Sequence, residues 1–448
     1  MTISAGEPAR RTLGSTTEPA GELGRTAAGE PVRVALLGST GSIGRQALDV
    51  FSAAGPERFR VVAMAAGRDA ATFARQLADV RPAVAALADA RAAATLELPR
   101  GTLLEHAPDA LERFATRDDV DLVVVATGGI VSLRPVLAAL RAAKPVATAN
   151  KETLVAGGHL VMPLARELAA ASRGYGASPL AWIRPIDSEH SAIWQCLAGE
   201  APSEVARLIL TASGGPFRTW PAERIAAATP AEALAHPNWT MGSKITIDSA
   251  SLMNKGLEVV EAHWLYDVDY AAIEVLIHPQ SLIHSLVEFV DGSLKAQIGL
   301  PDMRLPIQYA VTYPRRTPGP APRLDLLEHS QMTFEAPDEA RFPALRAARA
   351  AAAAGPRSTA ALIAADEIAV ERFLGGSLAF PGIAALVEAA VGRFGTGPEP
   401  GLAELIDLDA EVRAWSVGAA VGDRAGSGGS VRPGVKGSAA ASAGHADA

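Results

Sequence analysis

The stretch VALLGSTGSIGRQALDV, residues 34–50, decides the fold. A short apolar run ends at Gly38, and Gly41 and Gly44 follow at three-residue spacing where a helical pattern begins. Glycines allow a tight turn and a close backbone approach, while the N-terminus of the following helix offers N–H groups and partial positive charge. A strand, this glycine spacing and a helix form a variant of the dinucleotide fingerprint. The stretch predicts a Rossmann-like domain with Gly38 and Gly41 at the pyrophosphate. A glycine-rich turn without a ligand is the alternative.

The alternation of strand-like and helix-like segments continues from this turn to about residue 150. Between Ala-, Leu- and Arg-rich helical stretches lie four apolar runs, FRVVAMAAG (59–67), AVAALAD (83–89), DLVVVATGG (121–129) and KPVATAN (144–150). Apolar strands that alternate with helices predict βαβ units and a parallel sheet that is covered by helices on both faces.

The pattern changes in the second half of the chain. Strand-like runs with partial alternation are VARLILTAS (205–213), IEVLIHPQ (273–280), IHSLVEFV (283–290) and SLKAQIGL (293–300). Short loops join the last three, which predicts an antiparallel or mixed sheet. Three helical segments separated by Gly and Pro follow a Pro-rich stretch. The fold class expected is therefore α/β, with an N-terminal Rossmann-like parallel sheet, a central α+β catalytic domain with a mixed sheet and a C-terminal helical domain.

Composition shifts suggest the domain limits. The first 30 residues lack an apolar core typical of a secretory signal and carry four glutamates, while the last 28 are mostly Gly, Ala and Ser. We predict a disordered tail at 1–30, a dinucleotide-binding domain at 31–180, a catalytic and metal-binding domain at 181–312, a linker at 313–337, a helical domain at 338–420 and a second disordered tail at 421–448.

Bulk composition excludes several classes of protein. Of 448 residues, 49% are hydrophobic and 20% are charged, which is typical of globular domains. A net charge of −8 argues against nonspecific binding to nucleic acid or to a membrane surface. The single cysteine, Cys196, excludes an intrachain disulfide framework and fits a reducing cytoplasm. We expect a cytoplasmic protein, with Cys196 packed in the core because it lies on an apolar helix face.

The end of the second predicted strand, AAGRD, bears on the choice of cofactor. Dinucleotide enzymes that prefer NAD carry an acid at this strand end for the ribose 2′-hydroxyl. Here Gly67 and Arg68 come first, and a guanidinium suits a 2′-phosphate, so we expect NADPH. Asp69 follows directly and counts against that preference.

Two acidic clusters point to a metal site. In RPIDSEHSAIW, Asp187 and Glu189 would lie on one side of an extended backbone and repel each other unless a positive group separates them. In SASLMNKGLEVVEAHWL, one helix face carries Asn254, Glu258 and Glu261. An all-oxygen set of Asp187, Glu189 and Glu258 suits Mg²⁺ or Mn²⁺ better than zinc. There are two structural alternatives. The first acidic cluster could be a solvated strand end in which an Asp or Ser is the N-cap of the next helix. The second could be an ordinary solvated helix face.

Other polar residues of this region suggest a phosphorylated ligand. Hydroxyl, amide and ammonium groups fit a phosphate, and the candidates are Ser213, Ser249, Asn254 and Lys255. His236 and His278 are candidates to bind substrate, although a lone histidine is more often structural. The loop AHPNWTMGSK, with Trp239, would close over a small substrate or form a surface turn.

Eight short motifs occur in order: GSTGSIG, ANKE, DSEHSA, SGGPF, HPNWTMG, DSASLMNKGLE, IHPQS and PDMR. With them the chain resembles the 1-deoxy-D-xylulose 5-phosphate reductoisomerases over residues 31–420. These enzymes isomerise 1-deoxy-D-xylulose 5-phosphate and reduce the aldehyde with NADPH to 2-C-methyl-D-erythritol 4-phosphate, in non-mevalonate isoprenoid biosynthesis. The resemblance implies a divalent cation, Mn²⁺ or Mg²⁺, and a homodimer.

The resemblance also assigns roles to residues. It implies that Asp187, Glu189 and Glu258 hold the cation and act in catalysis with Lys151 and His236. The substrate contacts implied are Lys151, Ser188, Glu189, Ser213, His236, Trp239 as the lid, Ser249, Asn254, Lys255 and Glu258. The implied NADPH contacts are Thr40, Gly41, Ser42, Ile43, Gly67, Arg68, Asp69, Asn150, Glu152 and Gly242. Glu261 and His278 lie in family motifs without an assigned role.

The chain departs from the family pattern in a C-terminal helix. A segment usually like NAANE is IAADE here, with Ile363 and Asp366 in place of two asparagines. The departure lies outside the active-site motifs, so it bears on packing or an interface.

Two other functions remain as alternatives. A semialdehyde dehydrogenase needs a catalytic cysteine in a loop, whereas Cys196 lies in a predicted helix, and a simple dehydrogenase needs no three converging carboxylates. A binding protein that senses NADPH could lose the metal acids and the lid, but both are intact.

Overall fold

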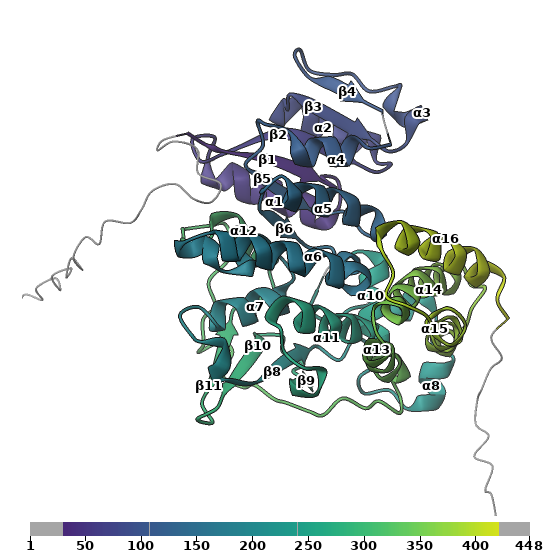
Figure 1. Ribbon diagram of the computed structural model, residues 1–448. Helices are drawn as coiled ribbons and strands as arrows, with labels where there is room; N and C mark the ends of the chain where they lie inside the picture. The colour runs from purple at the N-terminus through teal and green to yellow at the C-terminus, as the bar shows by residue number, and fades with distance from the viewer. Residues whose placement is uncertain (1–29, 107, 240, 421–448) are drawn as a thin grey trace, which may run out of the picture.

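The computed structural model describes residues 30–106, 108–239 and 241–420 (Figure 1). Its two sheets lie one beyond the other, with the C-terminal helices beside them (Figure 1). Apart from residue 30, the predicted tails at 1–30 and 421–448 lie outside the described residues. None of the described helices is long and apolar enough to cross a membrane.

The first sheet has seven strands in the order β4-β3-β2-β1-β5-β6-β7, and every neighbouring pair is parallel. Its strands are β1 (Val32–Leu37), β2 (Phe59–Ala66), β3 (Val84–Leu87), β4 (Leu103–Glu105), β5 (Leu122–Val125), β6 (Val146–Thr148) and β7 (Ile183–Pro185). β3, β5, β6 and β7 are buried along their whole length, as expected of parallel strands covered on both faces. The predicted parallel sheet is confirmed.

Helices connect these strands and cover the sheet. They are α1 (Ser42–Ala54), α2 (Ala70–Val80), α3 (Ala90–Ala93), α4 (Ala110–Thr116), α5 (Leu133–Arg141) and α6 (Lys151–Ala171). Two glycines at the turn from β1 into α1 are required because other backbone atoms lie too close to them for a side chain. Gly38 has a φ of 95°, and a Cβ there would lie 2.6 Å from the carbonyl carbon of Ala126. A Cβ on Gly44 would lie 2.2 Å from the carbonyl oxygen of Gly38.

The second sheet is mixed, as predicted, with the order β11-β10-β8-β9. Its strands are β8 (Val205–Ala212), β9 (Ile273–Ile277), β10 (Ile283–Phe289) and β11 (Leu294–Ile298). β10 is antiparallel to β8 and β11, whereas β9 is parallel to β8. The helices of this part are α7 (Ser188–Cys196), α8 (Ala222–Ala226), α9 (Pro230–Ala233), α10 (Ser243–Ser251), α11 (Met253–Tyr266) and α12 (Arg304–Thr312).

Four helices form the C-terminal part: α13 (Pro343–Ala354), α14 (Pro356–Leu374), α15 (Phe380–Phe394) and α16 (Leu402–Gly418). α14 packs on α6, and α13 packs on α11, so these helices touch both preceding parts. Short 3-10 helices lie at Ile130–Ser132, Gly174–Ala177, Pro179–Ala181, Pro202–Glu204 and Tyr270–Ala272. The Pro-rich stretch at 313–337 contains one isolated bridge, between Ile277 and Glu335.

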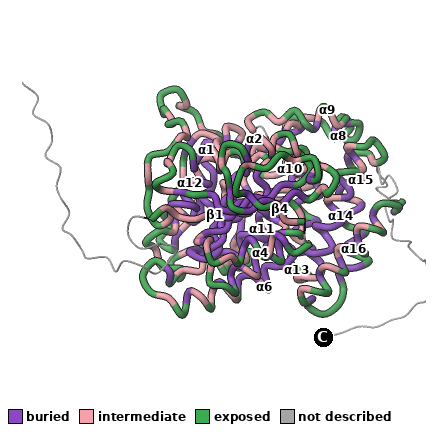
Figure 2. The backbone as a smooth tube through the Cα atoms, turned by 90° about the horizontal axis from the view of Figure 1, so that it is seen from above, coloured by how far each residue is buried: buried purple, intermediate pink, exposed green. Residues whose placement is uncertain are grey.

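The buried backbone forms a continuous interior (Figure 2). One hydrophobic cluster joins the parallel sheet to the C-terminal helices, and a second lies between the mixed sheet and α8, α11 and α15. β7 joins the first sheet although it follows the predicted limit at residue 180, because it pairs with β6. The domain limits themselves stay a prediction.

Candidate active site

A cavity of about 860 Å³ lies between the two sheets. It is lined by the start of α1, the start of α7, the end of β8, the loop before α10, the start of α11 and the turn before α12. Residues that belong to sequence-distant motifs therefore meet in one hollow. A cavity of this size matches the space that small-molecule ligands occupy in proteins.

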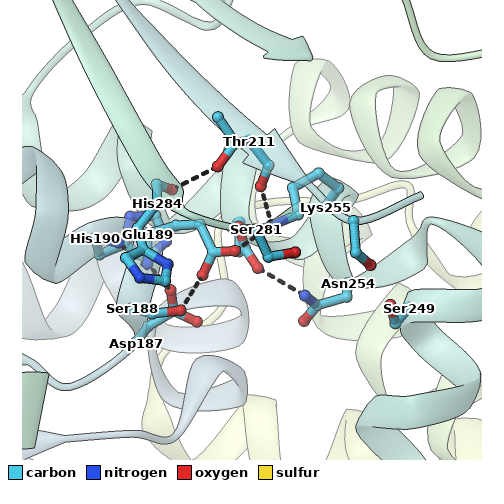
Figure 3. Close-up of polar contacts among 12 residues, drawn as sticks. Asp187, Ser188, Glu189, His190, Thr211, Ser249, Asn254, Lys255, Ser281 and His284 are labelled. Carbon is cyan, nitrogen blue, oxygen red and sulfur yellow. Dashed lines mark hydrogen bonds and ion pairs between the residues drawn. The ribbon is translucent and has the colours of Figure 1, made fainter. Parts of the chain in front are cut away.

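The three predicted metal acids come together in this cavity, and Figure 3 labels two of them, Asp187 and Glu189. One carboxylate oxygen from each of Asp187, Glu189 and Glu258 lies within 4.8 Å of the others. Asp187 is also the N-cap of α7, where its Oδ1 accepts hydrogen bonds from the backbone N–H groups of Glu189 at 3.0 Å and His190 at 3.4 Å. The expectation of an extended backbone here is wrong, because α7 begins at Ser188. Asp187 is the N-cap of a helix, as the alternative interpretation had it, and the three acids also come together.

Two buried lysines lie among these carboxylates. Lys151 Nζ forms an ion pair with Asp187 and lies 3.3 Å from Glu258 Oε1 and 3.6 Å from Glu261 Oε2. Lys255 Nζ lies 2.8 Å from Glu189 Oε1 and 2.7 Å from Glu258 Oε2. Lys255 was expected at a phosphate, and here it serves as a counter-ion of the acids.

The electrostatics of this cluster follow from burial and close charges. Burial alone would lower the pKa of both lysines, but the facing carboxylates outweigh it and raise the pKa of Lys151 and of Lys255. Burial would raise the pKa of Glu189, but Lys255 and Lys151 outweigh it and lower that pKa to about 2. The lysines stay charged and Glu189 stays ionised at neutral pH.

The donor set fits a divalent cation. The four acids of the cluster, Asp187, Glu189, Glu258 and Glu261, exceed the two lysines by two negative charges. A divalent cation supplies the two missing positive charges, and a set of carboxylate oxygens is what Mg²⁺ and Mn²⁺ prefer. Asn254 donates a hydrogen bond of 2.7 Å from Nδ2 to Glu258 Oε1 and so fixes that carboxylate.

His236 links the loop before α10 to two serines. Its Nδ1 accepts hydrogen bonds from the backbone N–H groups of Asn238 at 3.2 Å and Trp239 at 3.0 Å. The proton of the neutral ring therefore belongs on Nε2, which lies 3.0 Å from Ser213 Oγ and 3.1 Å from Ser249 Oγ. Burial and the charge of Lys255 lower the pKa of His236 to about 4, so the ring is neutral at pH 7.

The turn at β1–α1 fits a dinucleotide. No side chain caps the first turn of α1, so its N–H groups remain available to an anion, and Ser42 and Ile43 line the cavity. Gly67 and Arg68 are exposed at the end of β2, and the space beside Gly67 is open for 4 Å. Asp69 caps α2 by accepting a 3.0 Å hydrogen bond from the backbone N–H of Thr72, which lowers the pKa of Asp69.

The side chain of Asn150, a predicted NADPH contact, forms hydrogen bonds within the protein. Its Nδ2 donates to the carbonyl oxygens of Thr127 at 2.8 Å and Gly129 at 2.9 Å. Its Oδ1 accepts from the backbone N–H of Thr153 at 2.6 Å. These bonds fix the start of α6, which places Lys151 in the cavity.

The structure brings most predicted site residues together. The cavity is lined by Ser42, Ile43, Lys151, Asp187, Ser188, Glu189, Ser213, His236, Trp239, Gly242, Ser249, Asn254, Lys255 and Glu258. The lining excludes Gly38, Thr40, Gly41, Gly67, Arg68, Asp69, Asn150 and Glu152, which lie at the ends of β1, β2 and β6.

Sequence reasoning missed several lining residues: Gln46, Thr211, Asn238, Ser281, His284, Asp302 and Arg304. Four of these residues could have been found from the sequence, because they lie in motifs of the resemblance. Asn238 lies in HPNWTMG, Ser281 in IHPQS, and Asp302 and Arg304 in PDMR. His278 lies outside the lining and bonds through Nδ1 to the carbonyl oxygen of Thr333 at 2.9 Å. Cys196 is buried, and burial raises its pKa to about 11, which confirms the packed core cysteine.

Comparisons with known proteins agree along the chain. Family models match at residues 34–158 for "1-deoxy-D-xylulose 5-phosphate reductoisomerase", at 183–266 for its C-terminal domain and at 298–415 for "DXP reductoisomerase C-terminal domain". These matches include the glycine turn, the acidic clusters and the C-terminal helices.

Similar proteins carry the same name. The 1-deoxy-D-xylulose 5-phosphate reductoisomerase of Pelotomaculum thermopropionicum is 50% identical over 86% of this chain and 97% of its own length. That of Symbiobacterium thermophilum is 50% identical over 84% of this chain and 95% of its own length. A solved structure from Zymomonas mobilis, in complex with NADPH, is 38% identical with a TM-score of 0.75 and covers 87% of this chain and 98% of its own. Another, in complex with NADPH, fosmidomycin and magnesium, is 36% identical with a TM-score of 0.78 over 86% of this chain and 97% of its own. The chain therefore belongs to the 1-deoxy-D-xylulose 5-phosphate reductoisomerase family.

Proposed function

We propose that this protein converts 1-deoxy-D-xylulose 5-phosphate to 2-C-methyl-D-erythritol 4-phosphate, by a metal-dependent isomerisation followed by reduction with NADPH. The observation that carries the proposal is the convergence of Asp187, Glu189 and Glu258 in one cavity with the start of α1. A carboxylate metal site beside a dinucleotide turn suits a reaction that needs both a Lewis acid and a hydride. Solved relatives in complex with NADPH and magnesium support the same pair of cofactors.

The phosphate end of the substrate lies, in this proposal, at Ser213, Ser249, Asn254 and Lys255. Ser213 and Ser249 flank the Nε2 of His236, whose N–H at neutral pH can donate a hydrogen bond to a substrate oxygen. Asn254 and Lys255 start α11, one turn before Glu258. This order places the phosphate contacts next to the reacting carbons.

The reacting carbons lie, in this proposal, at the carboxylate cluster. A divalent cation held by Asp187, Glu189 and Glu258 supplies Lewis-acid polarisation of the substrate's carbonyl and hydroxyl oxygens. Lys151 keeps its positive charge beside those acids, so its Nζ can donate a hydrogen bond to an oxygen on which negative charge develops. Ser188 donates a 2.5 Å hydrogen bond to Glu189 Oε2 and holds that carboxylate in place.

NADPH supplies the hydride for the reduction. Its pyrophosphate would lie at Gly38, Thr40, Gly41, Ser42 and Ile43, where the first turn of α1 has no side-chain cap. Arg68 would pair with the 2′-phosphate. Asp69 is engaged at the start of α2, so we expect it to leave the preference for NADPH intact. Gly67, Asn150 and Glu152 contribute backbone and charge around the same ligand, and Gly242 does so from the other side of the cavity.

Residues 236–239, 241 and 242 belong to the loop that would close over the substrate. Trp239 is half-buried, its ring lies 6.1 Å from that of His284, and both residues line the cavity. A closed loop excludes water from a charged intermediate, which strengthens the electrostatics inside the site.

We also propose a cytoplasmic homodimer with no nucleic-acid or membrane partner. The single cysteine and the acidic net charge support the compartment and the absence of those partners. The resemblance to the family supports the dimer, and the pattern of the sequence supports the domain limits at 180, 312 and 337.

The test is oxidation of NADPH with 1-deoxy-D-xylulose 5-phosphate, followed by absorbance, with Mn²⁺ or Mg²⁺ and then with EDTA. NADH runs in parallel. We expect turnover that needs the cation and prefers NADPH. Absence of turnover from folded protein that binds NADPH in the presence of the cation would overturn the proposal.

A further inference from the structure

A second charge cluster, of two buried acids and a half-buried lysine, lies outside the cavity lining, where α10 meets α14. Lys244, the second residue of α10, has its Nζ 2.5 Å from Asp248 Oδ2 and 2.7 Å from Asp366 Oδ2. The side chains of Asp248 and Asp366 are 2% and 0% exposed. Asp248 belongs to α10 itself, whereas Asp366 belongs to a C-terminal helix. Lys244 therefore ties the helix that follows the loop over the site to the C-terminal part.

α10 is connected to the site at both ends. Gly242, its N-cap, lines the cavity and ends the loop of residues 236–242. Ser249, in its last turn, lies 3.1 Å from His236 Nε2. A shift of α10 would move the end of the loop and a predicted phosphate contact together, so whatever fixes α10 fixes both.

The charges around Lys244 are unbalanced. It faces two buried carboxyls, and Glu152 at the start of α6 adds a third acid at longer range. Arg413 of α16 does not relieve this excess, because it pairs with Glu367 and, at 2.7 Å, with Asp409. Burial, together with the facing Asp366, holds the pKa of Asp248 well above its usual range, although Lys244 opposes that shift.

Three oxygens of the cluster have no hydrogen-bond partner within the described residues, namely Asp248 Oδ1 and both oxygens of Asp366, although Asp366 Oδ2 has Lys244 as its ion-pair partner. A buried carboxylate oxygen without a partner is costly, so the second acid needs a reason. An asparagine at position 366 would leave Lys244 with one carboxylate.

We propose that Asp366, acting through Lys244, is a positioning residue that fixes α10 and its N-cap Gly242, at the end of the loop before α10, against the C-terminal helices. The inference rests on the proposed function, because it gives that loop its role over NADPH and substrate.

The test compares four variants: Asp366→Asn, Lys244→Gln, the double variant and Asp409→Asn. Asp409 is the matched control, since it is a half-buried acid in the same group of helices that pairs with Arg413 and not with Lys244. The readouts are the dissociation constant of NADPH, measured by fluorescence without substrate, and KM and kcat.

We expect Asp366→Asn to weaken NADPH binding about fivefold at neutral pH, as loss of one charge-assisted hydrogen bond suggests, with kcat within about twofold. Asp409→Asn should leave the binding constant as in the wild type.

Two results would overturn the inference. One is an equal change in Asp366→Asn and Asp409→Asn, which would mean that the C-terminal helices were simply weakened. The other is an effect of Asp366→Asn that persists in the Lys244→Gln background, because a residue that acts through Lys244 must lose its effect there. If Lys244→Gln does not fold, the first comparison decides alone. Wild-type protein that binds NADPH without turnover would instead contradict the proposed function.

Discussion

Replacement of Asp187 by asparagine separates the metal role of this residue from its structural role. Its Oδ1 caps α7, and its other oxygen pairs with Lys151. Asparagine is as good an N-cap as aspartate, so Asp187→Asn keeps both cap bonds and α7 should remain intact. The variant removes one negative charge from the site and little else.

The size of the effect follows from that charge. One unit charge about 4 Å from another is worth about 4 kcal/mol at an effective dielectric constant near 20, which corresponds to roughly a thousandfold in affinity. The double negative excess of the cluster becomes single, so a divalent cation would leave one surplus positive charge. We expect the affinity for Mn²⁺ to fall by about three orders of magnitude, and turnover at a fixed cation concentration to fall with it.

The assay is a titration of Mn²⁺ followed by the shift in melting temperature, beside NADPH oxidation with 1-deoxy-D-xylulose 5-phosphate. Asp89→Asn is the control, because Asp89 caps α3 by the same geometry, accepting from Arg91 and Ala92, away from the cavity lining. Asp187→Ala should cost about 1 kcal/mol more in stability than Asp187→Asn, since it also loses the cap. An Asp187→Asn protein that binds Mn²⁺ with the wild-type midpoint would refute the assignment of this carboxylate to the cation.

Three further predictions concern single residues. Arg68→Ala should raise the KM for NADPH about tenfold and leave that for NADH unchanged, as loss of a hydrogen bond to a charged group implies; equal changes would exclude a 2′-phosphate contact. Because the folded protein holds the pKa of His236 at about 4, below the usual 6.5, the unfolded chain takes up the proton first. Melting curves should therefore show the wild type losing stability relative to His236→Asn as pH falls from 6.5 to 4, and a constant difference would contradict a neutral His236. With its pKa raised to about 11, Cys196 should resist alkylation in the folded protein at neutral pH, and Cys196→Ala should keep its turnover; rapid labelling would argue against burial of the thiol.

The fold could be predicted where local pattern and burial agree. The long apolar runs of β2, β5 and β8 and the glycine turn before α1 carry enough residues to show their period. β6, although only three residues long, was found inside the apolar run KPVATAN, whereas β4 and β7 were not predicted. Both lie at the edges of the sheet, and their pairing depends on β3 and β6. α16 was not singled out either: its segment follows a Gly- and Pro-containing turn and shows no clear apolar face.

The acids of the site could be predicted by type but not by geometry. Asp187 and Glu189 were placed on an extended strand, whereas the cap bonds of Asp187 turn the chain into α7 at that point. The meeting of Glu189 with Glu258 depends on the packing of α7 and α11, which no local pattern encodes. The motifs in the resemblance supplied that contact indirectly, since they identified both acids as parts of one site.

The buried lysines explain how the acids can converge at all. Four close carboxylates, of which Glu258 and Glu261 are buried, would repel one another without nearby cations. Lys151 and Lys255 reduce that repulsion, and each reaches two or more acids at once. Their Nζ positions also reconcile the two roles of Lys255, which was expected at a phosphate and is observed on Glu189 and Glu258. An ammonium group between two acids is held most weakly when another positive charge, such as a divalent cation, neutralises those acids. Lys255 also lies next to Asn254, beside the predicted phosphate contacts. A counter-ion in the folding of the site can thus become a ligand for the substrate's phosphate without a change in the fold.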